Sequence, residues 1–161
     1  MSGFQSTITL GAVVIFGLIT LFFNTALLEN STSELENKVV LTAFALADDL
    51  IEEMKSKSFD ETTGQFPTSN PASLTPAGSL GPEAGEVYGS FNDIDDYNGF
   101  TKIVSAPHAE DYEVTCEVVY VQENYPDIQS SSQTFYKKAT VWVSSPFMRN
   151  QIYLSFIFTL K

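Results

Sequence analysis

The chain opens with a long apolar segment that carries no charge. Between Met1 and Leu28 there is no Asp, Glu, Lys, Arg or His, and the apolar run extends from Phe4 to Leu28. As a helix this run would be about 37 Å long at about 1.5 Å per residue. The hydrocarbon core of a bilayer is roughly 30 Å thick. The pattern therefore predicts a helix that is able to span a membrane.

Three interpretations of this segment remain open. A cleaved secretory signal needs a basic n-region and a shorter apolar stretch, and no Lys or Arg precedes this one. A plain transmembrane anchor fits the length and hydropathy, with the acidic C-terminal part exported. The third interpretation is a helix that lies first in a membrane and later in a protein assembly.

The helical period continues beyond the apolar run, with polar residues now on one side. Two apolar stripes recur every three or four residues, which predicts an amphipathic helix ending near Phe59. No Pro or Gly interrupts Phe23 to Phe59, which favours one helix of about 50 residues, although Ser31 and Ser33 also suit a helix cap after a break near Asn30. The stripes are Leu35, Val39, Ala43, Leu46, Leu50 and Met54, and Val40, Phe44, Ala47 and Ile51.

The composition changes after Phe59. Four prolines and four glycines lie between Asp60 and Gly85 among Ser and Thr, and no periodic pattern survives there. This stretch predicts a long loop.

From Glu86 onward the apolar residues alternate with period two. Alternation predicts strands in 111–122, 134–145 and 150–160 and a shorter one in 99–105, with hairpin connections around 125–132 and 146–150. One face of such an antiparallel sheet needs a cover, and the amphipathic helix supplies it. The expected fold class is α+β, with a long N-terminal α-helix packed on a C-terminal antiparallel β-sheet.

The expected organisation follows these changes of pattern. It consists of a hydrophobic N-terminal helix in 1–28, its amphipathic continuation in 29–59, a Pro/Gly/Ser-rich loop in 60–85 and a β-sheet domain in 86–161.

Three segments, together with the apolar helix, resemble the type IV pilin and pseudopilin family, in particular its minor-pilin-like members. They are LADDLIEEMKSKSFDE at the helix end, FNDIDDYNGF before the first strand and FYKKATVWVSSP in a later strand. The resemblance implies a pilin-like fold, in which the N-terminal helices pack subunits into a filament and the sheets form its outer shell.

The N-terminus departs from the usual family pattern. Pilins have a basic leader cut after a glycine, and here Gly3 is the only glycine in the right place, so cleavage would leave Phe4 first. The family's acidic fifth residue is replaced by Ile8 after such a cut, or by Gln5 if Met1 is the mature start. Gly3 and Phe4 are a candidate processing site, with processing by a prepilin peptidase left open.

The amino-acid composition argues against several classes of function. The chain has 20 acidic and 8 basic residues and a net charge of -12, which argues against binding the phosphates of nucleic acid. A single cysteine, Cys116, excludes an internal disulfide and a multi-cysteine zinc site, and a single histidine, His108, leaves few options for catalysis. We expect no enzymatic activity, no catalytic residues and no cofactor.

The remaining candidate site is weak. Asp93, Asp95 and Asp96 offer oxygen ligands to calcium, but the glycine and glutamate of an EF-hand are absent. A solvated turn is the favoured interpretation. His108 is expected to be exposed in a loop and Cys116 to be buried in a strand.

These observations predict a structural subunit of a type IV pilus-like extracellular filament at the cell surface. It would be membrane-inserted before assembly, would partner with copies of itself and with pilus assembly machinery, and would bind no nucleic acid. Two alternatives are a minor pilin or pseudopilin of a secretion or pilus machine, and a single-pass membrane-anchored surface-binding protein. The expected filament core comprises Phe4, Ile8, Gly11, Val14, Gly17, Leu18, Leu21 and Phe22.

Overall fold

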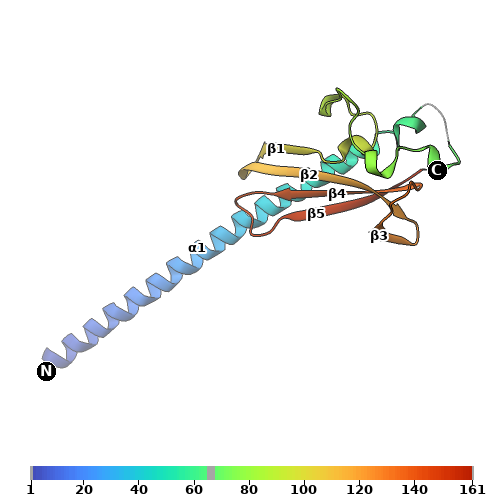
Figure 1. Ribbon diagram of the computed structural model, residues 1–161. Helices are drawn as coiled ribbons and strands as arrows, with labels where there is room; N and C mark the ends of the chain where they lie inside the picture. The colour runs from blue at the N-terminus through green and yellow to red at the C-terminus, as the bar shows by residue number, and fades with distance from the viewer. Residues whose placement is uncertain (1, 65–67, 161) are drawn as a thin grey trace. The chain divides into compact units, whose positions relative to one another are not determined.

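The computed structural model describes residues 2–64 and 68–160. The chain divides into two compact units, Met1–Lys38 and Val39–Lys161. Helix α1 (Ser2–Lys55) forms the described part of the first unit and opens the second (Figure 1). The prediction of one long helix is confirmed, because α1 has 54 residues and runs through Asn30, where a break was the alternative.

Within the second unit, α1 buries one stripe of small and aliphatic side chains. The stripe has helical spacing and lies at 0–6% exposure; it comprises Val39, Ala43, Ala47, Leu50, Ile51 and Met54. The predicted face was too wide, because Leu35 is 52% exposed and Phe44 is 42% exposed. Alanine at two of the buried positions allows the helix to approach its neighbours closely, so a narrow stripe is sufficient for packing.

The segment between α1 and the sheet contains short helical turns, and an isolated parallel bridge joins Ser58 to Asp93. The turns are η1 (Glu61–Thr63), η2 (Pro71–Ser73), η3 (Ala77–Ser79), η4 (Tyr88–Ser90) and η5 (Asp95–Tyr97). Asp60 and Asn70 cap η1 and η2 by accepting hydrogen bonds from backbone amides. Such caps satisfy the backbone of a loop that has no ladder partner.

The strands form an antiparallel sheet in the order β1-β2-β4-β5, with β3 paired to the end of β2 (Figure 1). Their bounds are β1 (Thr101–Ala106), β2 (Ala109–Gln122), β3 (Tyr125–Gln129), β4 (Tyr136–Ser144) and β5 (Ile152–Thr159). All four predicted strands are present. The chain is therefore an α+β protein with a long N-terminal helix and a C-terminal antiparallel sheet.

Strand β3 was not predicted, and its residues were expected to form a plain hairpin connection. It is short and pairs with β2 through Val121–Gln129 and Gln122–Tyr125. Pro126 and Asp127 make its sequence typical of a loop. Its pairing depends on the protruding end of β2, which sequence alternation does not reveal.

The alternation in β2 and β4 matches the buried face of the sheet. Tyr112, Val114, Cys116, Val118 and Tyr120 of β2 are all at 0–4% exposure. On β4 the buried positions are Lys137, Ala139, Val141 and Val143.

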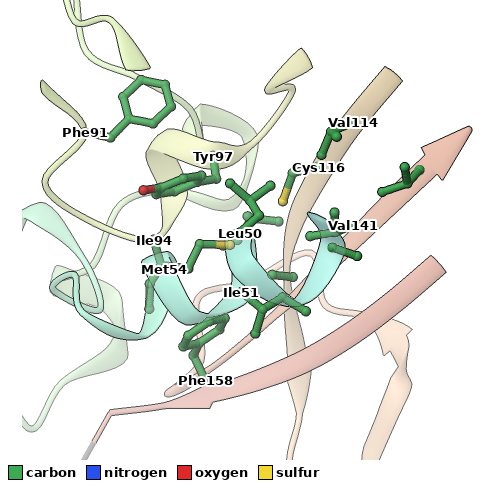
Figure 2. Close-up of a cluster of buried hydrophobic side chains, with 14 of the residues drawn as sticks. Leu50, Ile51, Met54, Phe91, Ile94, Tyr97, Val114, Cys116, Val141 and Phe158 are labelled. Carbon is green, nitrogen blue, oxygen red and sulfur yellow. The ribbon is translucent and has the colours of Figure 1, made fainter. Parts of the chain in front are cut away.

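The core lies between this face and the second-unit part of α1. In Figure 2, Leu50, Ile51 and Met54 extend from the helix toward side chains of the sheet, among them Cys116, Val141 and Phe158. Phe91, Ile94 and Tyr97 close the same cluster from the segment before β1. The segment 91–97 is thus held in place by the core, and so are the polar side chains that it carries.

Candidate functional site

The first candidate is the apolar N-terminal surface, which we define as the side chains from Phe4 to Leu28. Every residue of this stretch is exposed on all sides of the helix. Helix α1 from Gly3 is also long and apolar enough to cross a membrane, and none of its most apolar window is buried among the described residues. The larger side chains predicted for a filament core lie at 50–76% exposure: Phe4, Ile8, Val14, Leu18, Leu21 and Phe22.

Threonine hydroxyls along this surface have partners inside the helix. Thr7, Thr9, Thr20 and Thr25 each donate to the carbonyl oxygen of the residue four positions earlier, at 2.7–3.0 Å. A hydroxyl without a partner is costly to transfer out of water. These internal bonds satisfy the donors, so the surface can enter an apolar environment at low cost. The hydropathy pattern of the sequence does not reveal these bonds.

Two glycines, Gly11 and Gly17, lie among the large side chains of the same surface. A Cβ atom added at Gly11 or Gly17 would meet nothing within 4 Å. Neither glycine is therefore required by packing among the described residues. Small residues on an apolar helix permit close approach of another helix, as in membrane helix pairs.

The second candidate is a buried cluster of charges around Lys137 of β4. Its Nζ atom lies 2.5 Å from Asp95 Oδ1 and 3.0 Å from Asp60 Oδ2, and it donates to the Phe59 carbonyl oxygen at 2.7 Å. The side chains of the three charged residues are 0–1% exposed. The ammonium also lies over the rings of Phe59 and Tyr120, 4.7 and 5.4 Å from their centroids. The cluster therefore joins the segment after α1, turn η5 and the start of strand β4.

Asp60 is held ionised by this arrangement. Burial by itself would raise the pKa of Asp60, but the Lys137 charge and hydrogen bonds from Thr62, Lys137 and Thr75 outweigh it and lower the pKa. Its Oδ2 atom also accepts from the Thr75 amide at 3.0 Å and from the Tyr120 hydroxyl at 3.3 Å. A fully bonded carboxylate beside a buried ammonium is the arrangement that offsets the cost of burying both charges.

The predicted aspartate turn is present, but its interpretation as solvated was wrong. Asp93, Asp95 and Asp96 are at 0–1% exposure. Asp93 Oδ1 accepts from the amides of Asp95 and Asp96, and Asp96 Oδ2 accepts from the amides of Asn92 and Asp93. Burial and the neighbouring Asp95 raise the pKa of Asp93 to about 8, against the opposing effect of Lys137. One oxygen of each of the three aspartates is buried without a hydrogen-bond partner among the described residues.

Glu53 of α1 links two tyrosines at the helix end. The hydroxyl of Tyr88 donates to its Oε2 atom at 2.6 Å and that of Tyr97 donates to Oε1 at 2.7 Å. Burial and Glu53 raise the pKa of Tyr88 to about 12. A cavity of about 190 Å³ adjoins this contact, below the roughly 300 Å³ at which small-molecule pockets begin. It is lined by Leu46, Asp49, Leu50, Glu53, Tyr88, Phe100, Lys102, Val104 and Val114.

A third group of carboxylates brings one of the predicted calcium ligands together with two glutamates that the sequence analysis did not single out. Glu83, Glu86 and Asp96 place one oxygen each within 4.8 Å of one another. Gly85, at a φ of 92°, forms the turn that returns Glu86 toward Glu83, and the Glu86 amide donates to the Glu83 carbonyl at 3.0 Å. Asp93 and Asp95 are not part of this group.

The other singled-out residues lie as expected. His108 is exposed in the turn between β1 and β2, at a φ of 76°. Cys116 is buried, and burial raises the pKa of its thiol to about 12, which makes it a poor nucleophile. Cleavage between Gly3 and Phe4 stays a prediction.

No protein-family model, curated protein or solved structure matches this chain.

Proposed function

We propose that this chain is a structural subunit of a type IV pilus-like extracellular filament that polymerises through its apolar N-terminal helix. The proposed role is structural rather than enzymatic. Before assembly the helix would lie in the inner membrane, and pilus assembly machinery would transfer it from lipid to the growing filament.

The observation that carries the proposal is the contrast between the two parts of α1. The part in the second unit buries a stripe in its own core, at 0–6% exposure. The apolar N-terminal surface stays exposed on every side. Removing a large aliphatic or aromatic side chain from water stabilises a structure by about 1.5–3 kcal/mol. A surface of this size therefore favours lipid or copies of itself.

One detail fits lipid and copies of the chain alike, and two further details support copies as the final environment. The threonine hydroxyls are satisfied internally, as an apolar surrounding requires. Gly11 and Gly17 leave open space beside the helix, where a neighbouring helix can approach. The resemblance of the helix end and the aspartate turn to minor-pilin-like proteins points to the same arrangement.

The proposal is tested by comparing two aspartate substitutions. Leu18→Asp places a charge in the middle of the apolar N-terminal surface, whereas Ile128→Asp places one on exposed strand β3; the two side chains are 50% and 63% exposed. Fibres in material sheared from producing cells are counted by electron microscopy, and the chain remaining in the membrane fraction is measured in parallel. We expect Leu18→Asp to abolish fibres and Ile128→Asp to leave them.

The alternatives predict different results. A minor pilin would be present in fibres at low stoichiometry, with most of the filament made by another protein. A membrane-anchored surface-binding protein would form no fibres, and Leu18→Asp would change only its retention in the membrane. A normal fibre yield from Leu18→Asp would overturn the proposal.

A further inference from the structure

The carboxylates of Glu83, Glu86 and Asp96 converge at one point on the second unit. Glu83 and Glu86 lie three residues apart in the turn after Pro82, and Asp96 lies in η5. One oxygen of each is within 4.8 Å of the other two. Two oxygens bound to one Ca²⁺ ion are at most about 5 Å apart, since each lies about 2.3–2.6 Å from the ion. The spacing of the three carboxylates therefore fits a single calcium ion.

Asp96 supplies an independent sign of a missing partner. Its side chain is 1% exposed, and its Oδ2 atom accepts from the backbone amides of Asn92 and Asp93 at 2.8 and 3.1 Å. Its Oδ1 atom is buried with no hydrogen-bond partner among the described residues. A buried carboxylate oxygen left unpaired costs about 1–3 kcal/mol or more. A cation that binds this oxygen together with Glu83 and Glu86 would remove this cost.

The hydrogen bonds around the group position it without neutralising it. Glu86 Oε2 accepts from the Glu83 amide at 3.2 Å, and Glu86 Oε1 accepts from the Asn92 side-chain amide at 3.4 Å. The ion pairs of the described residues involve none of the three carboxylates.

We propose that Glu83, Glu86 and Asp96 bind a calcium ion. Carboxylate oxygens are hard ligands, and calcium takes six to eight of them in a flexible geometry. Glu83 is exposed and Glu86 is half-buried, which leaves room for water molecules to complete the coordination. Magnesium is smaller, demands near-ideal octahedral geometry and gives up its water molecules reluctantly, so three carboxylates from two segments of the chain suit it less well.

The site connects a segment that is packed in the core with a loop end that is more exposed. Asp96 belongs to the buried segment before β1, whereas Glu83 and Glu86 lie at the end of the long Pro/Gly-rich loop. Calcium would anchor that loop end to the sheet domain. This inference does not depend on the filament role, because all three ligands lie in the second unit.

The experiment is calorimetric titration of CaCl₂ into the full-length chain in detergent micelles, after removal of metals with EDTA. We expect one ion bound per chain and a higher melting temperature with calcium than with EDTA. Magnesium chloride in equal amount should raise the melting temperature less. Absence of binding at millimolar calcium would overturn the site, and equal binding of magnesium would overturn the assignment of the ion.

Three variants locate the ion. Glu83→Gln removes one charged ligand from an exposed position, and it should weaken calcium binding on the order of tenfold or more. Asp96→Asn retains an acceptor for the two backbone amides and should weaken binding at least as much. Glu113→Gln changes an exposed carboxylate of β2 and is the matched control, with unchanged affinity. If Glu83→Gln binds calcium as the unsubstituted chain does, the ion is elsewhere and the proposal fails.

Discussion

Lys137 Nζ lies 2.5 Å from Asp95 Oδ1, although the two residues are 42 positions apart in the chain. Both side chains are excluded from solvent, and Asp60, shortly after α1, binds the same ammonium. The contact therefore holds η5 and the segment after α1 against the sheet. It also fixes the turn from which Asp96 reaches Glu83 and Glu86.

Replacing Lys137 with methionine should destabilise the second unit strongly. The change leaves Asp60 and Asp95 buried without their cation, and breaking a buried ion pair costs about 3–5 kcal/mol. Urea unfolding of the detergent-solubilised chain, followed by Trp142 fluorescence, measures the loss. Lys138→Met is the control, because Lys138 pairs with the 94% exposed Asp127, and it should cost less than about 1 kcal/mol. Equal effects of the two substitutions would contradict a structural role for the cluster.

The lowered pKa of Asp60 predicts how stability changes in acid. The folded-state pKa lies below the ordinary value of 3.8, so the folded chain binds fewer protons than the unfolded chain around that pH. The contribution of ionised Asp60 is fully present above about pH 5 and is lost as the pH falls below 3.8 toward the folded-state pKa. The free energies of unfolding of the native chain and of Asp60→Asn should differ most near neutrality and converge in acid. A difference that does not shrink below pH 3.8 would contradict the assignment.

The contact between Glu53 and Tyr97 makes a third prediction. Tyr97 is fully buried, and its hydroxyl is bonded to a carboxylate oxygen at 2.7 Å. Tyr97→Phe removes this donor and leaves the oxygen unpaired, which should cost about 1–3 kcal/mol. Tyr125→Phe, at a 60% exposed position, should change the free energy of unfolding by less than about 0.5 kcal/mol. The same urea titration serves both variants.

The periodicity of the sequence was sufficient to predict the helix and the four main strands. It did not predict which residues pair with the buried charges. Alternation in β4 places Lys137 on the same face as Ala139 and Val141, and a lysine on an apolar face already indicates a buried acidic partner. The pattern does not reveal which carboxylates those are, because Asp60 and Asp95 reach it across 77 and 42 residues. Long-range contacts of this kind arise from the packing of loops, which has no periodic signal.

The burial of the aspartate turn could not be predicted from the sequence pattern, whereas the exposure of the apolar N-terminal surface could. The expectation of a solvated turn failed because the apolar residues Phe91, Ile94 and Tyr97 pull the turn into the core and carry the aspartates with them. The exposure of Phe4 to Leu28 followed directly from the uniform hydropathy of the run. Lipid and a bundle of copies offer the same apolar contacts, so hydropathy does not distinguish between them.

Gly17 distinguishes between these two environments. A Cβ atom added at Gly17 would meet nothing within 4 Å, and Gly17→Leu adds apolar surface, so membrane insertion should be retained. If a neighbouring helix approaches at this position, the added side chain should lower the yield of sheared fibres by more than half, on the order of the disruption expected of close-packed helix pairs. Gly78→Leu, another open position outside the helix, should leave the yield unchanged. Normal fibres from Gly17→Leu would place this glycine away from any helix contact.

The most direct test of the filament role is electron microscopy of material sheared from producing cells, with mass spectrometry of the intact subunit from the same fraction. We expect uniform fibres in which this chain is the main protein, and a helical reconstruction with the segment from Phe4 to Leu28 bundled at the fibre axis. The mass also shows whether the mature chain begins at Met1 or after Gly3. Retention of the whole chain in the membrane fraction, with no fibres that contain it, would contradict the filament role.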